Sequence, residues 1–251
     1  MRDVAALEAV LAGARVDDAV TALRPDYRAL LLAVDGIDAR TPSDGMSEAL
    51  LQAAEAHARQ ALAAGPVEEL PAVAAWREAY RAFGAKPQRT RNSLEALLRR
   101  AETGLPRVNL LTDVYNAVSV LHGLPLGGED LDRYAGSPRL VRASGDEPFD
   151  TAAGGETVVE HPEVGEVVWC DDAGVTCRRW NWRQARRTRL QESTTAALFI
   201  LDALGTTDDD ALAEAADDLL GHLRRLGPDV RVARRVLAPA DGTGASDGTG
   251  A

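Results

Sequence analysis

The order in which helical and strand patterns follow one another is the feature that most constrains the fold of this chain. Apolar residues at helical spacing predict helices at 47–65, 67–84, 92–102, 109–123 and 208–226. Short apolar or alternating runs predict strands at 27–36, 139–144, 156–161, 165–170, 175–183 and 195–204. Because helices and strands do not alternate strictly, the sequence predicts an α+β fold and not a doubly wound parallel sheet.

The 251 residues are enough to bury a substantial core. We predict a single domain over residues 1–237 and a disordered tail over 238–251, which is rich in Gly, Ser and Thr. The sequence shows no signal-peptide pattern and no apolar run near the roughly 18 residues that span a bilayer. Two cysteines, Cys170 and Cys177, cannot support a disulfide framework, so we expect a cytoplasmic protein with no membrane partner.

Several catalytic signatures are missing from the sequence. It contains no Gly-rich phosphate loop, no HExxH and no GxSxG. These absences argue against nucleotide hydrolysis, zinc proteolysis and the common serine esterases. Two thiols without a nearby histidine or further cysteine make a poor metal site, and we expect neither a metal nor another cofactor.

Positive charge is concentrated in two segments of an acidic chain. The formal net charge is −11, and the cationic residues are 27 arginines and the single Lys86. Segment 76–107 holds eight basic and three acidic residues, and segment 178–189 holds six arginines and no carboxylate. Overall repulsion argues against nonspecific coating of nucleic acid. The two segments are either solvated faces or local phosphate contacts.

The arginine-rich segment begins within the second strand of a predicted β-hairpin over 165–183, with its turn at 173–174. That register places Cys170 opposite Cys177. Period-2 alternation predicts one face with largely buried tryptophans and one more exposed face with polar side chains. The first comprises Trp169, Trp180 and Trp182, and the second comprises Arg179, Asn181 and Arg183.

The segment 105–134 resembles the tRNA-editing B3/B4 domain of the bacterial phenylalanyl-tRNA synthetase beta chain. It resembles still more closely the freestanding proteins that contain only that domain. The matching positions are Asn109, Asp113, Asn116, Gly123, Pro125, Leu126 and 130–132. Segments 145–156 and 174–184 also look like the freestanding group. The resemblance covers roughly residues 15–226 and is strongest over 76–205.

This resemblance implies hydrolysis of an amino acid wrongly esterified to tRNA, in an α+β domain with a β-sandwich-like centre flanked by helices. The editing-site asparagine of the family falls on Asn116. The family's histidine falls on Gly127, and its arginine position falls on Pro106, with Arg107 one place along. The carboxylate that reads the misacylated side chain is matched best by Asp202.

Hydrolysis of an activated ester requires a positioned water, donors for the oxyanion and exclusion of bulk solvent. The amide of Asn116 or Asn181 can orient water. We therefore predict Asn116 as catalytic, with Glu129 or Asp130 as the general base. Helix capping is the alternative interpretation for Asp130.

We predict substrate binding by a second group of residues. Gly127 and Gly128 would let backbone N–H groups approach a carbonyl, unless they only form a turn. The other predicted substrate-binding residues are Asn109, Tyr115, Asn181 and Asp202. The predicted tRNA contacts are Arg89, Arg91, Arg107, Arg179 and Arg183, which would hold the phosphates of a misacylated acceptor end.

These observations lead to a main functional hypothesis, a freestanding deacylase that clears mischarged tRNA. The alternative is a noncatalytic tRNA- or RNA-binding module that retains the editing fold. A third possibility is deacylation of a small aminoacyl ester, with the arginines as ordinary surface.

Overall fold

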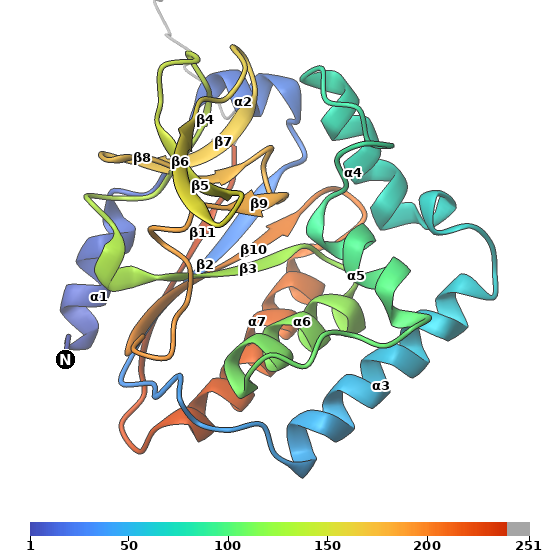
Figure 1. Cartoon of the computed structure of the whole chain (residues 1–251), viewed down its shortest axis with the longest axis vertical. Helices are drawn as coiled ribbons and strands as arrows, with labels where there is room; N and C mark the ends of the chain where they lie inside the picture. Colours follow the sequence, from blue (N-terminus) through green and yellow to red (C-terminus); the bar gives the residue numbers. More distant parts are fainter. Residues whose placement is uncertain (240–251) are drawn as a thin grey trace, which may run out of the picture.

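The structure is a computed structural model that describes residues 1–239 (Figure 1). The predicted disordered tail lies outside the described residues from position 240 onward. The helices are α1 (Val4–Ala12), α2 (Asp18–Leu23), α3 (Gly45–Leu62), α4 (Pro71–Ala82), α5 (Ser93–Ala101), α6 (Leu110–His122) and α7 (Asp209–Leu223). Three 3-10 turns are η1 (Val67–Glu69), η2 (Leu131–Arg133) and η3 (Arg224–Leu226).

Two larger sheets and one hairpin contain the strands. The four-stranded antiparallel sheet has the order β11 (Arg231–Leu237), β2 (Arg28–Asp35), β10 (Ala196–Ala203) and β3 (Leu126–Asp130). The five-stranded sheet has the order β1 (Arg15–Val16), β4 (Arg139–Arg142), β7 (Val167–Asp171), β8 (Gly174–Arg178) and β9 (Arg183–Gln184). Strands β5 (Phe149–Ala153) and β6 (Glu156–Glu160) form the separate hairpin.

The two larger sheets face each other across a shared apolar core. Leu31 and Leu198 come from the four-stranded sheet, and Leu140 and Trp169 from the five-stranded one. All four are buried in one cluster, as alternation along each strand requires. The predicted α+β fold with a β-sandwich-like centre is confirmed.

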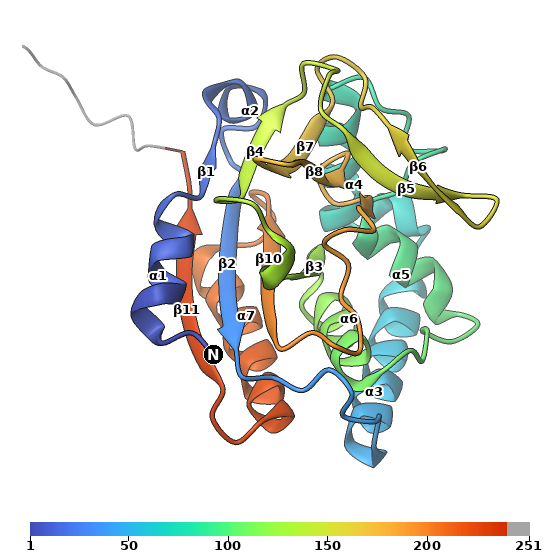
Figure 2. The same ribbon diagram turned by 60° about the vertical axis from the view of Figure 1, so that its left-hand side comes forward.

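Helices cover the remaining face of the four-stranded sheet. Helices α6 and α7 pack on it side by side (Figures 1 and 2), where Val114 and Leu212 join Phe199 in a second buried cluster. Helices α3, α4 and α5 enclose a third cluster against α6. The strand β3 therefore has α6 beneath it and α5 beside its exposed edge.

Helix caps account for several of the boundaries. The side chains of Asn92 and Asn109 each accept a hydrogen bond from the third residue of the helix that follows, at 2.8 and 2.9 Å. Gly123 ends α6 with a φ of 65°. Asp44 caps α3 and Ser47 completes a capping box. The helix begins at Gly45, two positions before the predicted start at 47.

The β7–β8 hairpin has a register different from the predicted one. Gly174 pairs with Asp171, so the turn lies at 172–173, and the predicted turn at 173–174 is wrong. Gly174 has a φ of 136°, and an added Cβ would lie 2.3 Å from the Pro148 carbonyl oxygen. The glycine therefore serves a close approach of two backbones inside the sheet and not the turn.

This register separates the two cysteines. Cys177 pairs with Trp169 beyond a bulge, whereas Cys170 pairs with Val175. The prediction that the two cysteines lie opposite each other is wrong. Both thiols are free and buried.

The predicted strand 175–183 is interrupted. Strand β8 ends at Arg178, and Arg179 and Trp180 have φ values of 48° and 68°. These left-handed conformations reverse the chain, and β9 pairs back onto β8. Two short strands replace the single predicted one.

The reversal changes the predicted faces. Trp180 is fully buried as predicted, but Trp182 is only half-buried. The guanidinium carbons of Arg179 and Arg183 lie 4.6 and 4.8 Å from the centroid of the Trp182 ring. Asn181 is 8% exposed, so its placement on an exposed polar face is wrong. The alternation rule fails there because the backbone is not extended.

Candidate functional site

A cavity of about 300 Å³ opens between the two larger sheets at the β3 edge. Helices α5 and α6 form one wall, and β7, β8 and the β8–β9 turn form the other. Its walls are mostly apolar, and Trp169, Trp182, Leu126 and Ile200 line it. The predicted site residues that line it are Tyr115, Asn116, Gly127, Glu129, Asn181 and Asp202. Six predicted residues from four separate elements thus meet at one cavity.

Asp202 lies in β10 with its side chain on the sandwich side of the sheet. The Tyr27 hydroxyl donates a hydrogen bond to Oδ1 at 2.5 Å, and Asn181 Nδ2 donates to Oδ2 at 3.2 Å. The Tyr80 hydroxyl in turn donates to Asn181 Oδ1 at 2.9 Å. This chain of donors fixes the orientation of both the amide and the carboxyl group.

Glu129 lies in β3 on the same side of the sheet. The register pairs Glu129 with Leu198, and residues paired across a ladder share a face. The Tyr134 hydroxyl donates a hydrogen bond to Glu129 Oε2 at 2.6 Å. The cavity therefore holds two carboxyl groups, Glu129 at 1% exposure and Asp202 at 2%.

Burial dominates the electrostatics of both carboxyl groups. It raises the pKa of Glu129 to about 7, against the opposing effect of the hydrogen bond from Tyr134. It raises the pKa of Asp202 to about 7 in the same way, against the hydrogen bonds from Tyr27 and Asn181. A carboxyl group that titrates near neutral pH can accept and return a proton in a reaction.

Asn116 lines the same cavity from helix α6. It is half-buried, and Tyr115 lines the cavity beside it. Asn109 does not line the cavity, because it caps α6. Its contribution is to fix where the helix begins.

The two glycines of β3 differ in position. A Cβ added to Gly127 would lie 3.2 Å from Gln184 Nε2, and this glycine lines the cavity. A Cβ added to Gly128 would lie 2.7 Å from the Phe199 ring, on the helix side of the sheet. Both are strand residues, so the interpretation of a turn is wrong. Gly127 leaves room for the amide of Gln184.

Asp130 also lies away from the cavity. It accepts hydrogen bonds from the Thr194 hydroxyl at 2.7 Å and from the backbone N–H of Asp132 at 3.0 Å, at the start of η2. This is the capping role that was the alternative interpretation. Of the two predicted general bases, only Glu129 lines the cavity.

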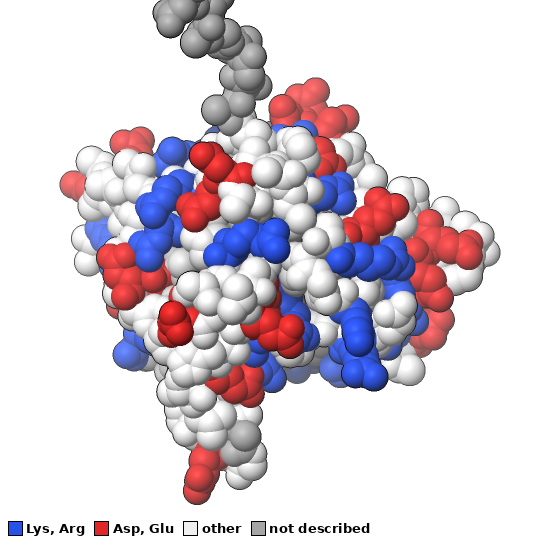
Figure 3. Space-filling view, turned by 90° about the horizontal axis from the view of Figure 1, so that it is seen from above, with Lys and Arg blue, Asp and Glu red and all other residues white. Residues whose placement is uncertain are grey.

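Most of the predicted tRNA-binding arginines are paired with acidic side chains. Arg179 contacts Glu166 and Arg183 contacts Glu160, at 3.5 and 3.0 Å. Arg107 pairs with two glutamates of α3, and Arg91 lies 3.7 Å from Glu95. Within residues 1–239, Arg89 has no carboxylate within 4.0 Å. Figure 3 shows basic and acidic side chains interspersed over one face of the molecule.

Several cavity residues were not predicted from the sequence. They are Ser93, Ala96, Leu97 and Arg100 of α5, Pro106, Trp169, Cys177, Trp182 and Gln184. Arg100 is exposed, and no carboxylate of residues 1–239 lies within 4.0 Å of it. The α5 residues follow the helical spacing that predicted the helix, but spacing alone did not indicate which side would meet β3.

Residues 1–239 contain neither a candidate metal site nor a membrane-spanning helix. No group of three or more His, Cys, Asp or Glu side chains is arranged to hold a metal ion. No helix among residues 1–239 is both long and apolar enough to cross a membrane.

Comparison with known proteins gives one family match. The model of the B3/4 domain family matches residues 75–215, which includes every residue that lines the cavity. The fold is similar to an N-terminal fragment of the phenylalanyl-tRNA synthetase beta subunit from Pyrococcus horikoshii, with a TM-score of 0.43 and 12% identity. That match covers 87% of this chain and 49% of the fragment, so the chain spans about half the length of the fragment. No curated protein sequence matches the chain.

Proposed function

This chain belongs to the B3/4 domain family, and we propose that it hydrolyses the ester bond of mischarged aminoacyl-tRNA in trans. The observation that carries the proposal is the convergence of Asn116, Glu129 and Asp202 on one largely apolar cavity. The resemblance of segment 105–134 to editing domains supports the same activity. A cavity of about 300 Å³ has room for an aminoacyl group.

In the proposed reaction Glu129 acts as the general base. Its ionised carboxylate takes a proton from a water molecule as the water oxygen attacks the ester carbonyl. The Asn116 amide N–H donates to the oxyanion that forms. When the intermediate collapses, the ester C–O bond breaks and the ribose oxygen recovers a proton from Glu129. The products are the free amino acid and uncharged tRNA.

Asp202 has a different proposed role. Both of its oxygens already accept hydrogen bonds, one from Tyr27 and one from Asn181. This fixed carboxyl group is better suited to reading the side chain of the misacyl group than to moving protons. We assign Asp202 to selectivity, as the resemblance implies.

Gln184 is a candidate replacement for the histidine that the resemblance implies at Gly127. Its Nε2 lies 3.2 Å from the position that a Cβ of residue 127 would take, and it donates to the Gly128 carbonyl oxygen at 2.9 Å. An amide donor thus occupies space that a side chain at 127 would fill. The proposed chemistry needs a donor there and not a titratable ring.

The test is deacylation of a panel of mischarged tRNAs by the wild-type protein, Glu129→Gln and Glu192→Gln. Glu192 is exposed and is not among the residues that line the cavity, so its variant is the matched control. For at least one combination of amino acid and tRNA, we expect the wild-type protein to release the amino acid faster than spontaneous hydrolysis does. This acceleration should be lost in Glu129→Gln and retained in Glu192→Gln. Release no faster than spontaneous hydrolysis for every pair would contradict the proposal.

The alternative function is a noncatalytic RNA-binding module. The specific observation that favours it is Gly127 in place of the family's histidine. Filter binding separates the two functions. Tight binding of uncharged tRNA without any deacylation supports the module.

A further inference from the structure

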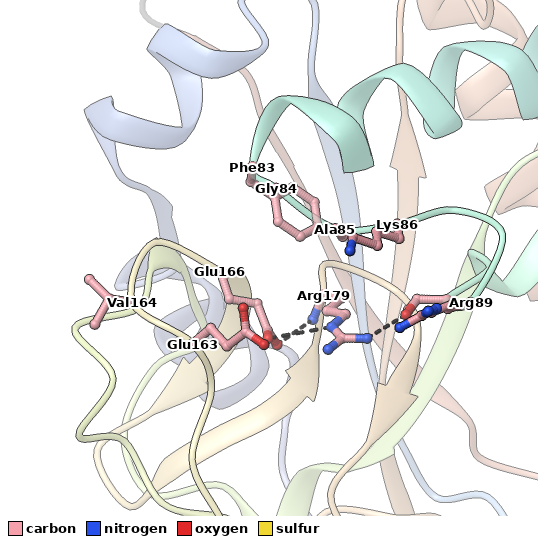
Figure 4. Close-up of a pocket in the computed structure, with 10 residues that line it drawn as sticks. Phe83, Gly84, Ala85, Lys86, Arg89, Glu163, Val164, Glu166 and Arg179 are labelled. Atoms are coloured by element: carbon pink, nitrogen blue, oxygen red, sulfur yellow. Dashed lines mark hydrogen bonds and ion pairs between the residues drawn. The ribbon is translucent and has the colours of Figure 1, made fainter.

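A second hollow lies on the surface beside the cavity. It has a volume of about 270 Å³ and is formed by segment 83–90, the loop 163–166 and Arg179 (Figure 4). Segment 83–90 begins where α4 ends, and Gly84 has a φ of 91° in the reversal that follows the helix. Figure 4 shows Lys86 and Phe83 on one side of the hollow and Glu163 and Glu166 on the other.

The base of the hollow is rigid and its acidic group is neutralised. Glu166, at 4% exposure, accepts two hydrogen bonds from Arg178 at 2.9 and 2.7 Å. Arg179 lies 3.5 Å from the same carboxylate and also donates to the buried Thr90 hydroxyl. Arg179 is therefore fixed between Glu166 and Thr90.

The rim carries two cationic side chains that form no ion pair within residues 1–239. Lys86 and Arg89 are exposed, and neither has a carboxylate within 4.0 Å in the part of the chain that the structure describes. Glu163 is exposed at the opposite rim and offsets part of this charge. Two flexible cations above a fixed guanidinium form a suitable site for an anion with several oxygens.

The hollow and the cavity are lined by neighbouring residues of the same two stretches of chain, 83–93 and 179–182. Segment 83–90 of the hollow continues into Ser93, which lines the cavity and whose backbone N–H donates to the Asn181 carbonyl oxygen at 3.1 Å. Arg179 of the hollow lies over the ring of Trp182, which lines the cavity. The hollow and the cavity are therefore neighbours in the fold.

We propose that the hollow formed by Lys86, Arg89 and Arg179 binds a backbone phosphodiester of the single-stranded RNA end whose terminal residue enters the cavity. This inference rests on the proposed function. The adjacency of the two places favours RNA over free phosphate, because a polymer presents a phosphodiester at a short distance from its terminal group. Lys86 and Arg89 bind the phosphate oxygens from the rim, and Arg179 contacts them from the base.

Lys86 is the only lysine of the chain, which gives the proposal a direct readout. Acylation of its amine with an activated ester is followed by peptide mass spectrometry, with the α-amino group as an internal reference. We expect the trinucleotide CCA to slow acylation of Lys86, and adenosine not to. Equal protection by adenosine, or by inorganic phosphate at the same concentration, would overturn the proposal.

A double variant provides the second test. Lys86→Gln with Arg89→Gln should weaken binding of uncharged tRNA about tenfold, since charge-assisted contacts are lost. The slope of log K against log salt should fall by up to about 0.7, the value for one single-strand phosphate contact. Arg224→Gln is the matched control, because Arg224 is exposed in η3 beside the start of α3. An unchanged affinity and slope would overturn the proposal.

The outcomes distinguish this inference from the proposed function. If CCA protects Lys86 but no mischarged tRNA is hydrolysed, the phosphate site stands and the deacylase proposal fails. If hydrolysis is observed but the double variant leaves its KM unchanged, the phosphate site fails and the deacylase stands. Because both side chains are exposed and unpaired, the variant should unfold at the wild-type temperature.

Discussion

The arginine-rich turn and the cavity beside it both contain buried carboxyl groups, but the two regions differ in whether these groups have a cationic partner. Glu166 is buried next to the turn and paired with Arg178 and Arg179. Glu129 and Asp202 are equally buried, but within residues 1–239 no Arg, Lys or His nitrogen lies within 4.0 Å of either group. A buried carboxylate that is paired with arginines supports the fold. A buried carboxyl group without a countercharge has a raised pKa and can exchange a proton near neutral pH. The clustered arginines in the sequence therefore mark the turn, where the buried carboxylate is paired, and not the cavity, where the buried carboxyl groups have raised pKa values.

Replacing Glu129 by Gln tests the reactive side of this comparison and has the largest expected effect. Loss of a general base is worth about 100- to 10,000-fold in rate, so single-turnover deacylation should fall by that factor. The melting temperature should not fall, because the neutral amide suits a buried site that already favours the protonated acid. Retained turnover would return Glu129 to a structural role.

Glu166→Gln is the reciprocal experiment. Removing one charge of a buried pair costs about 3 kcal/mol of unfolding free energy, at the lower end of the usual range because Glu160 still pairs with Arg178. Urea denaturation measures this loss. Single-turnover deacylation at a temperature where the variant is folded should remain close to wild type. A stable but inactive variant would contradict the division between the two regions.

Asn116→Ala should reduce turnover by about 10- to 1,000-fold, as expected for one positioned donor. tRNA affinity should remain nearly intact, since the amide faces the cavity and not the surface. If Asn116 only supports α6, activity and melting temperature would fall together. Measuring both quantities on the same preparation separates the two roles, and full activity would remove Asn116 from the site.

The pH dependence follows from the raised pKa values of Glu129 and Asp202, each about 7. A base must be ionised, so kcat/KM should rise with pH and level off above about 7. At pH 6 it should be about tenfold below the plateau, after spontaneous ester hydrolysis is subtracted. A flat profile between pH 5.5 and 8 would contradict the assignment of the base.

Stability should change in the opposite direction. Both groups bind a proton more tightly in the folded protein than in the unfolded chain, so their contribution to the unfolding free energy is highest at low pH. It should fall as pH rises from about 4 through about 7, by a few kcal/mol per group at most. Glu129→Gln should flatten part of this slope, which urea denaturation at several pH values measures.

The sequence predicted the framework of the site better than its chemistry. Apolar residues at helical spacing placed α5 and α6, and apolar runs placed β2 and β10. Strand β3 was not predicted, because Leu-Gly-Gly-Glu-Asp has little strand propensity and gains its conformation by pairing with β10. Without β3, the separate faces of Glu129 and Asp130 could not be assigned.

Contacts between distant residues account for most of what the sequence could not supply. Tyr27 reaches Asp202 across 175 positions, and Tyr80 reaches Asn181 across 101. The turn at Arg179 and Trp180 uses left-handed conformations that neither residue type indicates. The arginines of segment 178–189 resembled free cations because their acidic partners lie elsewhere in the chain.

Replacing Asp202 should change selectivity more than rate. Asp202→Ala removes a carboxyl group fixed by Tyr27 and Asn181, so the order in which misacyl groups are cleaved should change. Asp202→Asn keeps the shape and should alter the order less. The measurement is kcat/KM over the same panel of mischarged tRNAs. A uniform decrease for every pair would show that Asp202 supports the fold of the cavity and does not read the substrate.

The smallest expected effect is a difference in the salt dependence of tRNA binding between variants of a paired arginine and of an arginine without an acidic partner. Arg183 is paired with Glu160 at 3.0 Å, whereas Arg89 has no acidic neighbour within 4.0 Å among the described residues. Replacing Arg89 by Ala should lower the salt slope of tRNA binding by part of the roughly 0.7 expected for one single-strand phosphate contact. Arg183→Ala should lower it by less, because the carboxylate already neutralises much of that charge. Equal decreases would mean that tRNA displaces Glu160 from Arg183, and the paired arginines of the turn would then be phosphate contacts in the complex.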